Sequence, residues 1–155
     1  MSSDEEIIIQ GGCYCGAARY QTKGRPIRAA YCHCTLCQRL NAAAFIHGIH
    51  WNAEQFSWTH SDNPEEALQT YDVASKPWKR RFRCKKCGCA IAGHNTKTDK
   101  WSTWGAQLDR DENARIKNWD VIKPTDHIFY DTRMLDVNDG LPKWKGYGNE
   151  SERLD

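Results

Sequence analysis

The chain has 155 residues, of which 39% are hydrophobic and 27% charged, a composition typical of one globular domain with its own core. Its net charge is only +2, from 22 basic and 20 acidic residues, so no overall field favours a nucleic-acid partner. No apolar run approaches the ~20 residues that a membrane helix needs. The N-terminal stretch is acidic with three isoleucines, whereas a secretory signal needs a basic start and a longer apolar segment. These features predict an intracellular, cytoplasmic protein with no membrane partner.

Taken in chain order, the sequence is mostly a series of short segments rich in aromatic and β-branched residues, with turn signals about every ten residues. We expect strands at 18–22, 27–34, 44–51, 55–60, 68–73, 80–84 and 127–132. Short helical turns are expected at 35–42 and 64–68. No repeat, low-complexity region or linker divides the chain, so residues 7–147 form the expected domain, flanked by a disordered N-terminus at 1–6 and a C-terminal tail at 148–155. The prediction is an all-β or β-rich single domain held together by metal.

All eight cysteines fall in three short clusters: CYC at 13–15, CHCTLC at 32–37 and CKKCGC at 84–89. In a reducing compartment, clustered cysteines indicate metal binding or catalysis rather than disulfides. Disulfides within such short loops would be strained, whereas CxC and CxxC spacings suit zinc. The sequence therefore predicts Zn²⁺ as the cofactor.

The first and last clusters predict a structural zinc site. Residues i and i+2 of an extended strand face the same way, and CxxC presents two thiolates through a tight turn. A glycine follows the second ligand of each pair, where the chain must turn sharply around the metal. Together the two pairs supply the four thiolates of a closed site: Cys13, Cys15, Cys84 and Cys87.

The central cluster supplies only three thiolates: Cys32, Cys34 and Cys37. Three protein ligands with a vacant fourth position are typical of a catalytic zinc. Three alternatives stay open at this point. In the first alternative, His33 is the fourth ligand, although neighbouring residues in a strand face opposite ways. In the second, Cys89 is the fourth ligand. In the third, the pair at 13–15 joins two of the central cysteines.

Three segments, GGCYCGAARY, YCHCTLCQR and FRCKKCGCAIAG, resemble the glutathione-dependent formaldehyde-activating enzyme family, whose relatives include centromere protein V. The family pattern is an opening CxCG, a central CxCxxC and a later CxxCG before a strand. The closing HIFYDTRMLDVNDGLPKW extends the similarity over about residues 11–147. The resemblance implies a β-tent zinc fold, shared with a Rab-exchange-factor family. It also implies one structural zinc on the four-cysteine set and one catalytic zinc on Cys32, Cys34 and Cys37.

The chain departs from the family pattern at three places. The family usually has a glycine near position 42, where this chain reads LNAAAF, and commonly a tryptophan in place of Leu135. Cys89 stands where the family more often has Ser or Thr. These departures bear on the particular substrate more than on the fold.

The three-thiolate set favours thiol chemistry over hydrolysis. Thiolates donate electron density to zinc, so a bound water would be less acidic than the pKa of ~7 reached with neutral histidine ligands. An incoming thiol is a better match, because zinc deprotonates it while its sulfur stays nucleophilic. The resemblance implies the same chemistry: glutathione added to formaldehyde to give S-hydroxymethylglutathione, a carbon–sulfur lyase-type activity. Glutathione or another small thiol and a small carbonyl are the expected partners.

The carboxylates of glutathione need basic partners, for which Arg39 and the segment 79–83 are candidates. His94 and Asn95 are polar candidates for the pocket, and His127 for a proton carrier, although solvated or core positions account for each of them as well.

Three other functions stay open. The stretch KPWKRRFRCKK at 76–86 holds seven Lys or Arg in eleven residues and fits a nucleic-acid module, which the near-neutral total charge disfavours. A glutathione carrier without catalysis would use the same ligand set. A protein-interaction domain rests on fold analogy with the Rab-exchange relatives alone.

Overall fold

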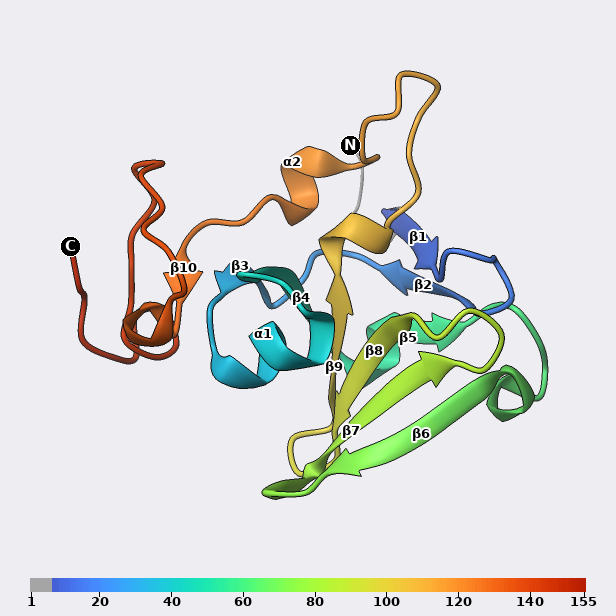
Figure 1. Cartoon of the computed structure of the whole chain (residues 1–155). Helices are drawn as coiled ribbons and strands as arrows, with labels where there is room; N and C mark the ends of the chain where they lie inside the picture. Colours follow the sequence, from blue (N-terminus) through green and yellow to red (C-terminus); the bar gives the residue numbers. More distant parts are fainter. Residues whose placement is uncertain (1–6) are drawn as a thin grey trace.

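The structure is a computed structural model that describes residues 7–155, and within them it has ten strands, two short α-helices and four 3-10 turns (Figure 1). The β-rich class predicted from the sequence is confirmed. No helix in the described part of the chain has the length and the apolar character to cross a membrane.

The strands form two sheets. The small sheet is antiparallel, in the order β1 (Ile8–Gly12), β2 (Arg19–Lys23), β5 (Phe56–Trp58). The large sheet has seven strands in the order β10 (His127–Ile128), β3 (Arg28–Cys32), β4 (Ile46–Asn52), β9 (Lys100–Trp104), β8 (Ala90–Asn95), β7 (Lys76–Cys84), β6 (Leu68–Val73). Its pairs are antiparallel except for β10 and β3, which run parallel.

The core lies on one face of β4, and this decides where the site is. Ile49 and Trp51 are fully buried there, and the indole N–H of Trp51 donates to Thr103 Oγ1 at 2.9 Å. Tyr20 of the small sheet belongs to the same core cluster and stacks on Phe56. Because side chains alternate across a strand, the even-numbered residues of β4 face the other way, onto the face that forms the cavity described below.

Six predicted strands are present: β6 (Leu68–Val73) has the predicted ends, and β2, β3, β4, β5 and β7 have shifted ones. The helical turns expected at 35–42 and 64–68 are α1 (Thr35–Asn41) and the 3-10 turn η3 (Pro64–Ala67). The strands β1, β8 and β9 and the helix α2 (Trp119–Ile122) are not among the sequence-based expectations. β1 and β8 contain glycine and alanine in place of alternating large residues, which weakens the period-2 signal.

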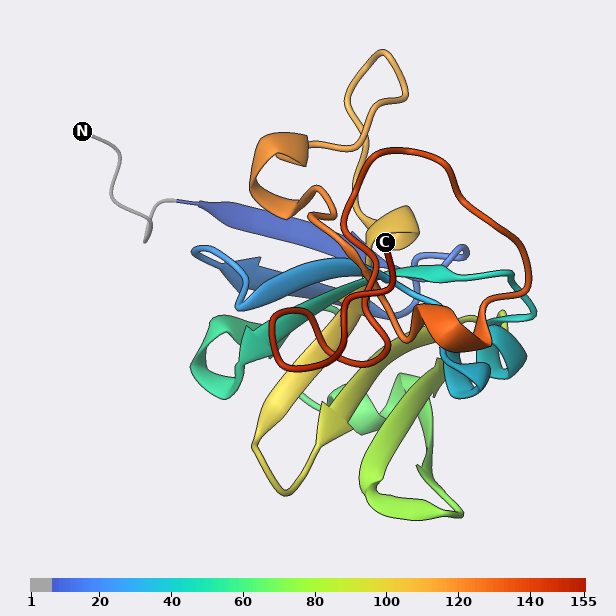
Figure 2. The same ribbon diagram turned by 90° about the vertical axis from the view of Figure 1, so that its left-hand side faces the viewer.

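The strand expected at 127–132 is wrong beyond Ile128. Phe129 has φ of 53°, a left-handed conformation that ends the strand, and Tyr130–Thr132 form the 3-10 turn η5. The Tyr130 N–H bonds instead to the carbonyl of Trp144 at 2.9 Å. Figure 2 shows η5 next to α1, where Gln38 Nε2 donates to the carbonyl of Thr132 at 2.9 Å.

The C-terminal residues fold back on the preceding segment. The N–H of Lys145 donates to the Glu152 carbonyl at 2.9 Å, and the N–H of Leu154 donates to the Lys143 carbonyl at 2.8 Å. The segment 148–155 is therefore hydrogen-bonded to its neighbour, whereas the sequence alone favours a solvated tail. The disordered end expected at 1–6 lies outside the described residues, and the domain limits at 7 and 147 stay predictions.

Candidate metal centres and the adjoining cavity

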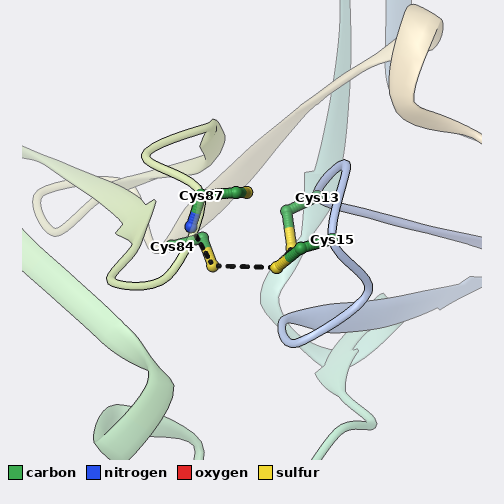
Figure 3. Close-up of side chains that lie close together, drawn as sticks. All are labelled: Cys13, Cys15, Cys84 and Cys87. Carbon is green, nitrogen blue, oxygen red and sulfur yellow. Dashed lines mark hydrogen bonds between the residues drawn. The ribbon is translucent and has the colours of Figure 1, made fainter.

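The structure brings the first and last cysteine clusters together. The β1–β2 loop carries one pair and the end of β7 with its following turn carries the other, and in Figure 3 the two pairs point toward one another. All four Sγ atoms lie within 4.8 Å of one another: Cys13, Cys15, Cys84 and Cys87.

The sulfur spacing fits tetrahedral zinc. The Sγ atoms of Cys13 and Cys15 are 3.6 Å apart, and those of Cys15 and Cys84 are 3.7 Å apart. A tetrahedral zinc with Zn–S bonds of ~2.3 Å separates its sulfurs by about 3.8 Å. Backbone N–H groups also point at the sulfurs, from Ala18 to Cys13 at 3.3 Å and from Cys87 to Cys84 at 3.5 Å. Such N–H groups stabilise thiolate charge, so this donor set suits a closed, four-thiolate ion.

Two glycines allow the turns that make this cluster. Gly16 and Gly88, each directly after the second cysteine of its pair, have φ of 80° and 78°, in the left-handed region that a side chain disfavours. Cys89, which follows Gly88, is partly buried and lies outside the four-sulfur group.

The central cluster forms a second group of three sulfurs within 4.8 Å of one another: Cys32, Cys34 and Cys37. Cys32 ends β3, and Cys34 is the N-cap residue of α1, its sulfur accepting the N–H of Cys37 at 3.3 Å. The helix thus begins where the second ligand must turn back toward the first.

A cation fits this group because three thiols in contact cannot all ionise without one. Hydrogen bonds from Cys32 and Cys37 lower the pKa of Cys34, while the bond to Cys34 raises the pKa of Cys32 well above its ordinary value. Ionisation of one thiol therefore disfavours ionisation of its neighbours. Three thiolates require a compensating divalent cation, and zinc is the one that such soft donors favour.

His33 lies outside the three-sulfur group. Its ring is fully buried, stacks on Phe45 with centroids 4.7 Å apart, and has Nε2 2.8 Å from His127 Nδ1. His127 Nε2 is in turn 2.7 Å from Asp139 Oδ2. Burial lowers the pKa of His33 to about 4, so the ring is neutral at ordinary pH. His127, predicted as a proton carrier, is buried between His33 and Asp139 and is not among the residues that line the cavity.

A cavity of about 660 Å³ adjoins the three-cysteine cluster on the face of the large sheet opposite the core. Its floor is made of alternate residues of the central strands, among them Ala30, Gly48 and Ser102, whose small side chains leave the space open. Helix α1 contributes one wall, and the C-terminal segment contributes Phe129 and Tyr147 to another. All three cysteines line this cavity, so a ligand inside it reaches their sulfurs.

The cavity is strongly basic. Five cationic side chains line it: Arg28, Lys76, Lys79, Arg81 and Lys100. Among the described lining residues, Glu150 is the one acid, and its carboxylate is 3.9 Å from the Arg28 guanidinium. A negatively charged ligand is therefore favoured over a neutral one.

The alternation of β7 divides the predicted basic segment. Lys79 and Arg81 line the cavity, whereas Arg80 pairs with Asp72 at 3.1 Å and Arg83 donates to the Gly88 carbonyl at 2.8 Å. Two of the four basic candidates at 79–83 thus reach the cavity. Alternation turns Arg80 away, and a register shift between Phe82 and Arg83 breaks the alternation before Arg83.

Of the other predicted pocket residues, one lines the cavity and two do not. Asn95 lines the cavity, but His94 stacks on Trp101 with centroids 4.5 Å apart and bonds to Asp99. Arg39, at the end of α1, is not among the residues that line the cavity.

Sequence reasoning missed several lining residues on other strands: Arg28, His50, Lys100 and Trp104. No local motif marks them, and only the period-2 pattern of β3, β4 and β9 combined with the correct pairing would have placed them on one face. Burial, and then the charge of Arg28, lowers the pKa of His50 to about 4, so this imidazole is neutral inside a basic cavity.

The fold and the site define a β-rich, single-domain protein with two cysteine clusters suited to zinc, one of four sulfurs and one of three beside a basic cavity. The family model of the glutathione-dependent formaldehyde-activating enzyme matches residues 8–132, and the chain belongs to this family. The predicted family is thereby confirmed, and the β-rich fold is consistent with a β-tent.

Among solved structures, one match is the crystal structure of a Rhodobacter sphaeroides protein. It is 18% identical with a TM-score of 0.49, and the match covers 64% of this chain and 87% of that chain. No curated protein matches the chain.

Proposed function

We propose that the protein binds glutathione, or a similar small anionic thiol, at the three-cysteine cluster and adds it to formaldehyde or a related small carbonyl. The product with glutathione and formaldehyde is S-hydroxymethylglutathione. One observation carries this proposal: the three sulfurs open into a cavity of about 660 Å³ that five basic side chains line.

The two clusters take different roles in this proposal. The four-cysteine set holds a structural zinc, and the central set, Cys32, Cys34 and Cys37, holds a second one. When bound at the central set, zinc supplies a position for an incoming thiol and lowers the pKa of that thiol.

The rest of the site belongs to the chain. The volume lies within the range of small-molecule pockets, and glutathione carries two carboxylates that need cationic partners. Arg28 on β3 and Lys100 on β9 come from opposite sides of β4, so the cations surround the ligand instead of forming one patch. Phe129 and Tyr147 give the cavity an aromatic wall on one side.

This division of the basic residues favours a small anionic ligand over a nucleic acid. The residues of 76–86 do not form one continuous basic face, since Lys79 and Arg81 face the cavity and Arg80 is paired on the opposite side. A nucleic-acid backbone would need them aligned on the surface.

Native mass spectrometry with and without glutathione tests the proposal. We expect two zinc ions per chain and a mass shift of one glutathione that is lost in Cys34→Ser. Cys89→Ser is the matched control, because this cysteine lies outside both sulfur groups, and it should keep both zinc ions and the adduct. A wild-type protein that takes up no thiol would contradict the proposal.

Catalysis requires a separate measurement because formaldehyde and glutathione also combine spontaneously. Exchange NMR of the two reactants should show formation of S-hydroxymethylglutathione above the uncatalysed rate with wild type, and not with Cys34→Ser. A thiol adduct with no acceleration would leave the protein a glutathione carrier.

A further inference from the structure

The Lys79 ammonium is a half-buried charge without a fixed partner. It lines the cavity from β7, on the far side of the large sheet from β3, where the cysteine cluster begins. Among residues 7–155 no hydrogen bond or ion pair fixes it, in contrast to its neighbour Arg80, which pairs with Asp72. A buried charge without a partner is costly, so this position needs an explanation beyond packing.

The ammonium and the three sulfurs line the same cavity. The pKa of Cys34 is lowered by the hydrogen bond from Cys32 and, across the cavity, by the charge of Lys79. In return, the charges of Cys34 and Cys37 act on Lys79. A ligand held at the sulfurs therefore shares the cavity with the ammonium.

The surroundings of Lys79 also make it readier to release a proton. Burial is the main cause that lowers its pKa, followed by the neighbouring charges of Lys76 and Arg81. Arg81 is held in place: a Cβ on Gly93 would come within 2.7 Å of Arg81 Nη1, so the missing side chain makes room for the guanidinium. That nitrogen also donates to the Arg80 carbonyl at 3.2 Å.

His50 is another titratable group in the cavity, at the end of the β3–β4 ladder opposite Cys32. Its low pKa leaves it without a proton to give at neutral pH.

The proposed reaction needs a proton donor. When the thiolate sulfur forms a bond to the carbonyl carbon, the π electrons of the carbonyl move to its oxygen, which becomes an alkoxide. A proton must then reach that oxygen to give the hydroxymethyl product. The thiol released one proton to solvent when it became a thiolate, so the overall reaction, thiol plus aldehyde to hemithioacetal, is balanced when one proton returns.

We propose that Lys79 is the proton donor of this addition, giving an Nζ proton to the oxygen of the carbonyl substrate and recovering it from water. This role rests on the proposed function. Donation from a positioned side chain contributes about 10²–10⁴-fold to rate, so loss of the group leaves thiol binding and removes most of the acceleration.

The test compares Lys79→Met and Lys79→Arg in the full-length, zinc-loaded protein. Glutathione affinity is measured by calorimetry and product formation by exchange NMR, corrected for the spontaneous rate. We expect both variants to bind glutathione within about tenfold of wild type and to lose about 100-fold or more in rate. Arginine keeps the charge but does not release a proton, so Lys79→Arg separates proton donation from attraction of an anion.

Two further measurements complete the test. Arg80→Met is the matched control, because it removes one positive charge from the next residue of β7 on the side away from the cavity, and it should keep the wild-type rate. In Lys79→Ala, added small alkylammonium ions should restore part of the rate in proportion to their acidity.

The outcomes distinguish this role from the proposed function itself. A wild-type rate in Lys79→Arg, or equal losses in Lys79→Met and Arg80→Met, would overturn the role of Lys79 while wild-type turnover upholds the function. A wild-type protein that binds no thiol, or binds it without acceleration, would overturn both.

Discussion

Replacing one ligand of the four-cysteine cluster should destabilise the whole domain, and Cys13→Ser is the change that tests this. The cluster joins the β1–β2 loop to the end of β7, and Cys15 and Cys84 are 69 residues apart in the chain. Treated as a cross-link, closure of a loop of this length stabilises the fold by about 4 kcal/mol. The three-cysteine cluster closes a loop of only a few residues, for which the same relation gives about 2 kcal/mol. Cys34→Ser should therefore leave a folded protein.

The assay is urea unfolding followed by tryptophan fluorescence, together with a zinc count on each variant. We expect Cys13→Ser to lose one zinc and about 4 kcal/mol or more of unfolding free energy, a decrease in Tm of about 10 °C or more. Cys89→Ser should keep both zinc ions and the wild-type midpoint. A Cys13→Ser protein with the wild-type midpoint would refute the assignment of this cluster as the structural one.

Three further predictions concern the cavity. Gly48→Leu should lower glutathione affinity at least about tenfold in calorimetry, because the added side chain fills the cavity floor. Tm should change little, since a Cβ at this position meets nothing closer than 3.5 Å. Unchanged affinity would mean that the thiol binds elsewhere. Arg28→Met should weaken glutathione about tenfold but leave the affinity for cysteamine, which has no carboxylate, as in wild type; equal losses for both thiols would argue against a carboxylate contact. The folded-state pKa of His50 is about 4, below its ordinary value of 6.5, so folding favours the neutral ring. The contribution of this ring to the free energy of unfolding is therefore present above pH 6.5 and is lost as the pH falls toward 4. In zinc-saturated urea titrations, the free energy of unfolding of His50→Gln should therefore fall by up to about 2 kcal/mol less than that of wild type between pH 7 and pH 5. Identical pH profiles for the two proteins would exclude a ring that folding keeps neutral.

The sequence by itself determined the three cysteine clusters, the glycine turns after the first and last pairs and the short helix α1, whereas the folded chain brings the first and last pairs together. These features follow from local rules: CxC and CxxC set the direction of two sulfurs within a few residues, and Gly16 and Gly88 adopt the left-handed turns that the spacing demands. The family follows from the same motifs, since they are what its pattern consists of.

Only the tertiary structure decided what surrounds the sulfurs. Lys79 and Arg81 face the cavity together with Arg28 and Lys100, whereas Arg80 turns away. The register of the large sheet places the first four residues on one face and Arg80 on the other. A shift of one residue in that register would exchange the two faces, and no local pattern records it.

The histidines and the segment after β10 give the same lesson. The sequence places His33 beside two cysteines, yet its ring bonds to His127, which in turn bonds to Asp139, and both come from a segment far along the chain. Phe129 ends its strand with a positive φ, and the next N–H, that of Tyr130, bonds to the Trp144 carbonyl. Ligand spacing is a short-range property that the sequence states directly, whereas the cavity, its charge and its proton donor arise where distant strands meet, which only the folded chain specifies.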